Sequence, residues 1–146
     1  EALNSRQKSV KGARILVLGV TYKADVEDTR NSPATHVIEL LLGMGADVGY
    51  SDPYVSRLHL GEGGRPSNGR RLDSVPADPD NLNWADCVVI ITPHNLFYLP
   101  GIVSRASLVV DTCNGTGSAG EAAGKVFKLG VGDVARDALE PSYDDP

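Results

Sequence analysis

Residues 15–33 read ILVLGVTYKADVEDTRNSP, and this stretch decides the fold. The nearly continuous apolar run over residues 13–20 is typical of a parallel strand that is buried on both faces. Ser32 then offers a hydroxyl that can cap a helix, and Pro33 suits the first helical position. We therefore predict a strand, a loop and a helix in succession. Such a loop is where open α/β sheets bind ligands.

Strands and helical segments alternate along the rest of the chain. Short apolar runs predict further strands at residues 46–51, 87–91, 108–110 and 126–129. Helical segments are predicted from Pro33 to a C-cap at Gly45, at residues 81–85, and at residues 96–105 with an interruption at Pro100 and Gly101. The alternation indicates one α/β domain with a mainly parallel sheet of about five strands. Residues 53–81 have little periodicity and are expected to form a long functional or mobile connection.

The composition is that of an ordinary globular protein and excludes several functions. The 146 residues include 41% hydrophobic and 23% charged residues, and the net charge is −5. An acidic balance argues against a nucleic-acid surface. No apolar run has the length of a membrane span, and no signal-like segment opens the sequence. Cys87 and Cys113 lack C-x-x-C spacing, so we expect no metal site and a reducing, cytoplasmic compartment.

Lys23 and Arg30 make the loop a candidate anion site. An ammonium group just past the first strand can meet a phosphate, although a lone lysine is usually a solvated surface group. The Arg30 guanidinium can contact a phosphate near the helix start, or it can pair with Asp25, Glu27 or Asp28. Asp28 is expected to be either a structural partner that orients Arg30 or an acceptor for backbone amides of the loop. The loop lacks the second glycine of the G-x-G-x-x-G fingerprint, which argues against a self-contained dinucleotide site.

Three further polar residues follow predicted strands at the same edge. Asp52 occupies the place of a ribose-binding acid, but an Asp-Pro turn is the preferred interpretation. His94 is either an acid–base or ligand-binding group or a histidine packed against its neighbours. Cys113 could form a thiol–imidazole dyad with His94, although chance often supplies such pairs. The 53–81 connection carries four arginines, Arg57, Arg65, Arg70 and Arg71. They either close over a phosphorylated ligand or stay solvated, and we favour the solvated loop.

Several motifs together resemble the UDP-glucose/GDP-mannose dehydrogenase family, and specifically its C-terminal, UDP-binding domain. They follow the order of the family and extend over nearly the whole chain: GVTYK (19–23), DTRNSP (28–33), VGYSDPY (48–54), VVIITPH (88–94) and LVVDT (108–112). The combination of Tyr-Lys with Asp-x-Arg-x-Ser-Pro is the specific part of the resemblance.

The resemblance implies a three-layer Rossmann-like domain that binds a UDP-sugar within an NAD-dependent nucleotide-sugar 6-dehydrogenase. It implies substrate contacts for Tyr22 and Lys23 and a contact to NAD for Arg30, with Asp28, His94 and Cys113 as possible lining of the site. NAD is expected to be bound mainly by an N-terminal domain, and the nucleophilic cysteine to lie in a middle domain. This chain alone is then expected to hold no catalytic residue and to be inactive.

The same resemblance implies the boundaries and the partners of the domain. Residues 1–11 are expected to be the end of a helix from the middle domain, 12–139 the UDP-binding domain, and 140–146 an acidic tail. The expected partners are a UDP-sugar and the remaining domains of an enzyme that is a homo-oligomer, with no nucleic acid and no membrane.

The sequence departs from the family pattern at Cys113, where many members have an arginine that helps to hold the nucleotide. A neutral thiol cannot replace that fork of donors. Thr92-Pro93-His94 favours the UDP-N-acetylhexosamine branch over the UDP-glucose branch. The alternative function is a stand-alone nucleotide-binding or regulatory module without catalysis, and a small thiol enzyme using Cys113 and His94 is a remote third.

Overall fold

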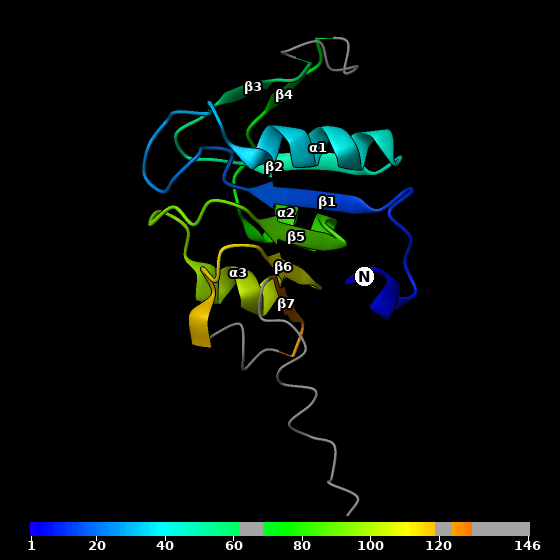
Figure 1. The fold of residues 1–146 in the computed structure, drawn as a ribbon. Helices are drawn as coiled ribbons and strands as arrows, with labels where there is room; N and C mark the ends of the chain where they lie inside the picture. The colour runs from blue at the N-terminus through cyan, green and yellow to red at the C-terminus, as the bar shows by residue number, and fades with distance from the viewer. Residues whose placement is uncertain (62–68, 119–123, 130–146) are drawn as a thin grey trace, which may run out of the picture.

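A five-stranded parallel sheet forms the centre of the fold (Figure 1). The computed structural model describes residues 1–61, 69–118 and 124–129. Neighbouring strands are parallel and lie in the order β2-β1-β5-β6-β7. Their bounds are Arg14–Leu18 (β1), Asp47–Ser51 (β2), Cys87–Ile90 (β5), Val109–Asp111 (β6) and Val126–Lys128 (β7). The predicted α/β class and the predicted parallel sheet of five strands are confirmed.

Strand β1 is buried on both faces, as its apolar run predicted. Successive side chains of a strand point to opposite faces of the sheet. Ile15 and Val17 accordingly belong to one hydrophobic core, and Leu16 and Leu18 belong to another. Leu18 stands beside Ser51 of β2 and Ile90 of β5 in the register, so three strands end together at one edge of the sheet.

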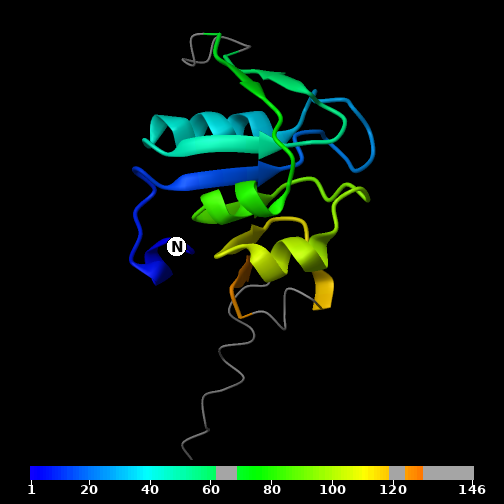
Figure 2. The same cartoon turned by 180° about the vertical axis from the view of Figure 1, so that it is seen from behind.

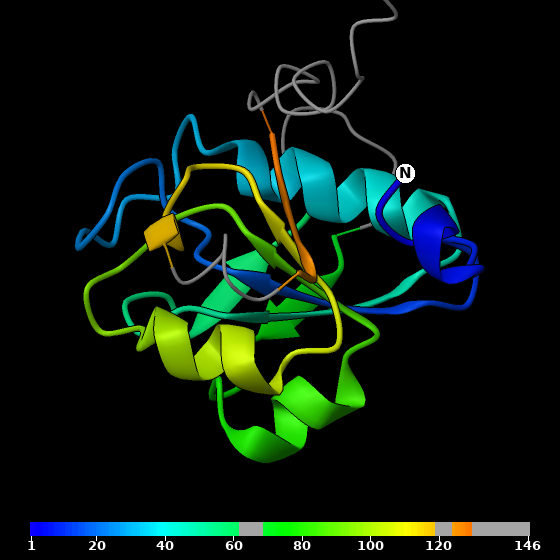
Figure 3. The same cartoon turned by 90° about the horizontal axis from the view of Figure 1, so that it is seen from below.

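Helix α1 (Pro33–Gly43) covers one face of the sheet (Figures 1 and 3). Its start is the predicted one, because the Ser32 hydroxyl accepts a hydrogen bond from the Ala34 amide at 3.2 Å and Pro33 opens the first turn. Ile38 is fully buried against the sheet. Gly45 has φ +86°, the left-handed conformation expected just after a helix.

Helices α2 (Pro79–Trp84) and α3 (Leu99–Arg105) cover the opposite face, which makes three layers (Figures 2 and 3). Leu82 and Ile102 pack there into one core with Val88 of β5. The predicted interruption of the segment 96–105 is wrong. Pro100 lies in the first turn of α3, where its missing N–H leaves no hydrogen bond unmade.

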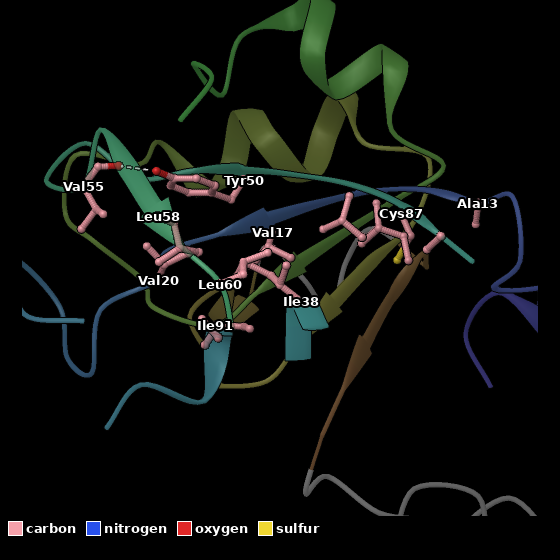
Figure 4. Packing of buried hydrophobic residues seen from close by; sticks show 14 of the residues in the cluster. Ala13, Val17, Val20, Ile38, Tyr50, Val55, Leu58, Leu60, Cys87 and Ile91 are labelled. Atoms are coloured by element: carbon pink, nitrogen blue, oxygen red, sulfur yellow. Dashed lines mark hydrogen bonds between the residues drawn. The ribbon is translucent and has the colours of Figure 1, made fainter. Parts of the chain in front are cut away.

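An antiparallel hairpin, β3 (Arg57–His59) and β4 (Arg71–Asp73), lies within the connection 53–81, for which no strand was predicted. Leu58 and Leu60 are buried on the α1 side of the sheet (Figure 4). In the same view the Tyr50 hydroxyl donates to the Val55 carbonyl at 2.9 Å. The Glu39 carboxylate of α1 accepts a hydrogen bond from the Gly61 amide at 2.8 Å, so the hairpin is held against the helix.

Residues 1–11 hold a single 3-10 turn, Asn4–Arg6, in place of the expected end of an α-helix. Gln7 has φ +58°, a left-handed conformation that ends the turn. The Lys8 ammonium pairs with Asp86 at 2.7 Å and fixes this segment to the start of β5. A role for residues 1–11 as the continuation of a longer helix stays a prediction.

Two expectations fall on residues that are not described, Arg65 and the acidic tail 140–146. Among the described helices, none combines the length and the apolarity that crossing a membrane requires.

Candidate functional site

Gly19, which directly follows β1, lies in close contact with Thr92, two residues after the end of β5. Its φ is +81°, and a Cβ at this position would lie 2.3 Å from the Thr92 carbonyl oxygen. The Thr92 hydroxyl also donates to the Thr21 carbonyl at 2.6 Å. The glycine therefore lets two chain segments approach each other. Where a G-x-G-x-x-G loop leaves room for a pyrophosphate, this chain places the backbone of Thr92.

His94 is buried beneath the loop, with 1% of its surface exposed. Its Nδ1 accepts a hydrogen bond from the Asp25 amide at 2.8 Å, and its Nε2 lies 2.8 Å from Asp52 Oδ2. The ring also packs edge-on against Tyr54, with 4.9 Å between ring centroids. Both ring nitrogens are thus engaged within the chain. Of the two interpretations offered for His94, the packed histidine is the one that the geometry supports.

The Asp52 carboxylate is buried and fully engaged by protein donors. Oδ2 accepts from the Val20 amide at 2.8 Å and from His94, and Oδ1 accepts from the Tyr54 amide at 2.8 Å. These bonds leave no oxygen directed to a ribose. Asp52 is nevertheless more than an Asp-Pro turn, because it joins the end of β1 to the end of β5. The Asp52–His94 pair was missed by the sequence analysis, although both residues follow strands that end at the same edge.

Tyr22 and Lys23 lie on the exposed side of the same loop. Tyr22 is 48% exposed, and the Lys23 ammonium lies 5.5 Å from the centroid of the Tyr22 ring. The Tyr22 amide donates to the Asp28 carbonyl at 3.0 Å, which draws the two arms of the loop together. A cation–π contact at such an exposed site is worth only about 0.5–1 kcal/mol, so the ammonium remains available to a stronger partner such as a phosphate.

Asp28 and Arg30 form a two-bonded ion pair on the loop. Arg30 Nε donates to Asp28 Oδ1 at 3.0 Å, and Nη2 donates to Oδ2 at 2.9 Å. These bonds lower the pKa of Asp28 to about 2 and raise the pKa of Arg30. The Arg30 side chain is still 85% exposed. The ion pair, which was one of the two interpretations of Arg30, is present, and it fixes the direction of the guanidinium without covering it.

A polar hollow of about 550 Å³ adjoins this ion pair. Residues 27–30 form one side of it, and residues 54–57 form the other. Its cations are Arg30 and Arg57, of which Arg57 also pairs with Asp73 at 3.1 Å. Glu27 and Asp28 line it as well, and the exposed side chain of Arg30 is accessible from it.

A larger and mainly apolar hollow of about 620 Å³ lies between the end of β2 and the helices α2 and α3. Phe97, Tyr98 and Ile102 line it, and Arg105 is the one cation among the described residues that line it. Tyr22, Lys23 and Arg30 do not line it. The exposed cations of the loop and this apolar hollow are therefore separate features of the molecule.

The turn after β6 is organised around Asp111, whose side chain is fully buried. Oδ1 accepts from the amides of Cys113 and Gly115, and Oδ2 accepts from the amide and the hydroxyl of Thr116. Burial alone would raise the pKa of Asp111, but the hydrogen bonds from Thr116, Gly115 and Cys113 hold it below its usual value. Asp111 is therefore a structural anion that shapes the turn.

Cys113 lies on that turn and bonds to Asp111, with 3.5 Å between Sγ and Oδ1. Partial burial and the neighbouring carboxylate raise the pKa of the Cys113 thiol. A raised pKa keeps the thiol protonated, whereas a nucleophilic cysteine needs a lowered one. His94 has both nitrogens engaged elsewhere, so the geometry does not support a Cys113–His94 dyad. In the part of the chain that is described, no three metal-ligating side chains gather at one place.

A family model described as UDP-glucose/GDP-mannose dehydrogenase family, UDP binding domain, matches residues 16–117. A UDP-N-acetyl-D-mannosamine dehydrogenase of Methanococcus maripaludis is 34% identical over 92 residues, which are 63% of this chain and 18% of the relative. A UDP-glucose 6-dehydrogenase of Rhizobium meliloti is 36% identical over 92 residues, or 60% of this chain and 19% of that protein.

Among solved structures, a UDP-glucose dehydrogenase from Pyrobaculum islandicum is similar with a TM-score of 0.56 and 29% identity. The similarity covers 75% of this chain and 24% of that structure. The chain thus spans about a fifth of the length of the curated relatives it matches. Because the family model matches well over half of its residues, the chain belongs to the UDP-glucose/GDP-mannose dehydrogenase family and corresponds to its UDP binding domain.

Proposed function

We propose that this chain is the UDP-sugar-binding domain of a larger NAD-dependent nucleotide-sugar 6-dehydrogenase. The proposal depends mainly on the position and exposure of the loop formed by residues 19–32. It is fixed at the carboxyl edge of the parallel sheet and leaves Lys23 and Arg30 exposed. Ligands of open α/β folds bind at this edge. Membership of the family supports UDP as the ligand class.

Lys23 is assigned to the diphosphate of the UDP-sugar, and Tyr22 to a neighbouring part of the same ligand. A lysine ammonium serves phosphates as a compact point charge. A hydrogen bond from a charged donor is worth about 1.5–3 kcal/mol, which exceeds the cation–π contact that Lys23 now makes. The exposed Tyr22 ring supplies an apolar surface next to that charge.

Arg30 is assigned to NAD that another part of the enzyme holds. The residues of this chain do not fit a complete NAD site, since Thr92 fills the space beside Gly19 and the Asp52 oxygens are engaged. Arg30 can instead contact an NAD molecule that is bound elsewhere in the enzyme. Its guanidinium carries five N–H donors, of which Asp28 takes two, and the side chain is largely exposed.

The reaction proposed for the whole enzyme converts the C6 alcohol of the sugar into a carboxylate. Two NAD molecules take up the four electrons, and water supplies the second oxygen. In this chain Lys23 binds the nucleotide and Arg30 orients the neighbouring cofactor. Neither residue reacts with C6, so we propose that the isolated chain is inactive. The oligomeric state and the compartment of the enzyme stay predictions.

The sugar is proposed to be a UDP-N-acetylhexosamine. Thr92-Pro93-His94 supports this choice, as does the similarity to a relative named UDP-N-acetyl-D-mannosamine dehydrogenase. Cys113 in place of an arginine predicts that the chain holds the nucleotide weakly, because a neutral thiol offers no fork of donors.

Calorimetric titration of the 146-residue chain with UDP tests the assignment of Lys23. Loss of one charged hydrogen bond predicts a Kd about 10–100-fold higher for Lys23→Ala. Lys11→Ala is the matched control, since Lys11 is exposed and precedes β1 at the opposite end of the strand. Equal affinity of Lys23→Ala and the wild-type chain would remove Lys23 from the site. The alternative of a stand-alone module requires that the whole protein forms no NADH from any UDP-sugar.

A further inference from the structure

The segment from Val20 to Asp25, which carries Tyr22 and Lys23, is pinned at both ends by one buried chain of hydrogen bonds. The Val20 amide donates to Asp52, and His94 Nε2 reaches the same Asp52 oxygen. On the other side of the ring, His94 Nδ1 accepts from the Asp25 amide. The imidazole thus links the first residue of the segment to the last one.

The protonation of His94 follows from its partners. A backbone amide can only donate, so Nδ1 must present a lone pair to the Asp25 amide. The ring proton therefore resides on Nε2, which donates to the Asp52 carboxylate. The Thr21 hydroxyl lies 3.3 Å from Nε2 but gives its own proton to the Lys23 carbonyl at 2.7 Å, so it adds a second acceptor. Only the neutral Nε2–H tautomer satisfies all of these contacts.

We propose that His94, in the Nε2–H tautomer, is a positioning residue that holds the segment 20–25 in the shape that presents Lys23 to the nucleotide. The proposal rests on the proposed function of Lys23 as a UDP contact. Asp25 has φ +60°, a left-handed conformation that aspartate tolerates better than most residues, and its carboxylate also accepts a hydrogen bond from the Asn95 amide at 2.7 Å. The charged groups that face the ring are Asp52 and, at 4.0 Å from Nδ1, the Asp25 carboxylate.

Two substitutions of His94 test the two hydrogen bonds of its imidazole separately. The amide of an asparagine overlays Nδ1, and the amide of a glutamine overlays Nε2. His94→Asn can therefore keep an acceptor for the Asp25 amide, while His94→Gln keeps only the bond to Asp52. A purely structural role predicts that both variants behave alike, because both leave a cavity. A positioning role through Asp25 predicts that His94→Asn is the milder one.

The first measurement needs no ligand and no variant. Long-range ¹H–¹⁵N correlation on the wild-type chain should show a protonated Nε2 and an unprotonated Nδ1 for His94. A protonated Nδ1 would overturn the proposal. Amide hydrogen exchange should then be at least about tenfold faster at Asp25 in His94→Gln than in His94→Asn, since the exchange rate follows the opening of that hydrogen bond. Equal protection of Asp25 in the two variants would also overturn it.

UDP titration completes the test. If the freed segment occupies the competent shape about a tenth of the time, the Kd of His94→Gln rises about tenfold, and His94→Asn restores most of the affinity. Unchanged UDP affinity in a folded His94→Gln chain would refute the positioning role. Failure of the wild-type chain to bind UDP would instead refute the proposed function, while the tautomer and exchange results still decide on the hydrogen bond itself.

Discussion

Asp52→Asn should weaken the whole domain, because no arrangement of an asparagine satisfies the donors around position 52. Three groups donate to this carboxylate: the amides of Val20 and Tyr54 and the Nε2–H of His94. In the better orientation the asparagine oxygen accepts from Val20 and His94, and its NH₂ group then faces the Tyr54 amide. A change of tautomer at His94 gives no relief, since Nδ1–H would face the Asp25 amide.

The magnitude follows from these contacts. One buried donor without a partner costs about 1–3 kcal/mol, and two bonds to a charged acceptor each lose about 1 kcal/mol when the acceptor becomes neutral. Removing a buried charge recovers part of its desolvation cost. We therefore expect the free energy of unfolding to fall by about 2–4 kcal/mol.

Urea unfolding, followed by circular dichroism and analysed by linear extrapolation, measures this loss. Asp73→Asn is the control, because the Asp73 side chain is 73% exposed and forms an ion pair with the exposed Arg57. That substitution should change the free energy of unfolding by less than about 1 kcal/mol. A loss below 1 kcal/mol for Asp52→Asn, or equal losses for the two variants, would refute the reasoning about the buried network.

Three further predictions concern the glycine at the end of β1, the turn after β6 and the ion pair on the loop. In urea unfolding, Gly19→Ala should lower the free energy of unfolding by several kcal/mol more than Gly12→Ala. Both glycines have φ near +80°, but of the two only Gly19 lies where a Cβ would collide with a backbone oxygen. Equal losses of free energy in the two variants would contradict this. Cys113→Arg should lower the Kd for UDP about tenfold, because it adds a charged fork of donors, whereas Cys113→Ser should leave the Kd unchanged. If calorimetry shows no gain in UDP affinity for Cys113→Arg, this turn is not part of the nucleotide site. The pKa of the Asp28 carboxyl should be about 2 by ¹³C NMR, and it should rise in Arg30→Ala, which removes the side-chain bonds but keeps the hydrogen bond from the backbone amide of residue 30. The stability from this pair is present above the ordinary pKa of about 3.9 and is lost as the pH falls through about 2. An unshifted titration in the wild-type chain would show that the pair does not form in solution.

The parts of the fold that depend on neighbouring residues were predictable from the sequence. The apolar run of β1 and the Ser32-Pro33 start of α1 are local signals, and both are found at the expected positions. The pairing of Arg30 with Asp28 spans only two residues, and it was one of the two interpretations offered for Arg30. The hairpin was missed because its strands have three residues each, although Leu58 and Leu60 alternate with polar residues.

The buried side of the site depends on contacts between distant residues, which a single sequence does not reveal. Asp52 and His94 are 42 residues apart. They meet because the strands that they follow, β2 and β5, both pair with β1 and end at the same edge of the sheet. Their pairing engages Asp52 and both ring nitrogens of His94 within the chain. The assignments of Tyr22, Lys23 and Arg30 to ligands stay predictions.

The most direct test of the account is a steady-state assay of the whole enzyme, with NADH formation followed at varied UDP-sugar and varied NAD. The loop of residues 19–32 is proposed to face two ligands. A substitution of Lys23 and a substitution of Arg30 should therefore each change the KM for a different ligand. Lys23→Ala should raise the KM for the UDP-sugar about tenfold or more and leave the KM for NAD near the wild-type value. Arg30→Ala should do the reverse. Variants that both affect the same ligand, or that both leave the two KM values unchanged, would contradict the claim that this loop lies between the nucleotide sugar and the cofactor.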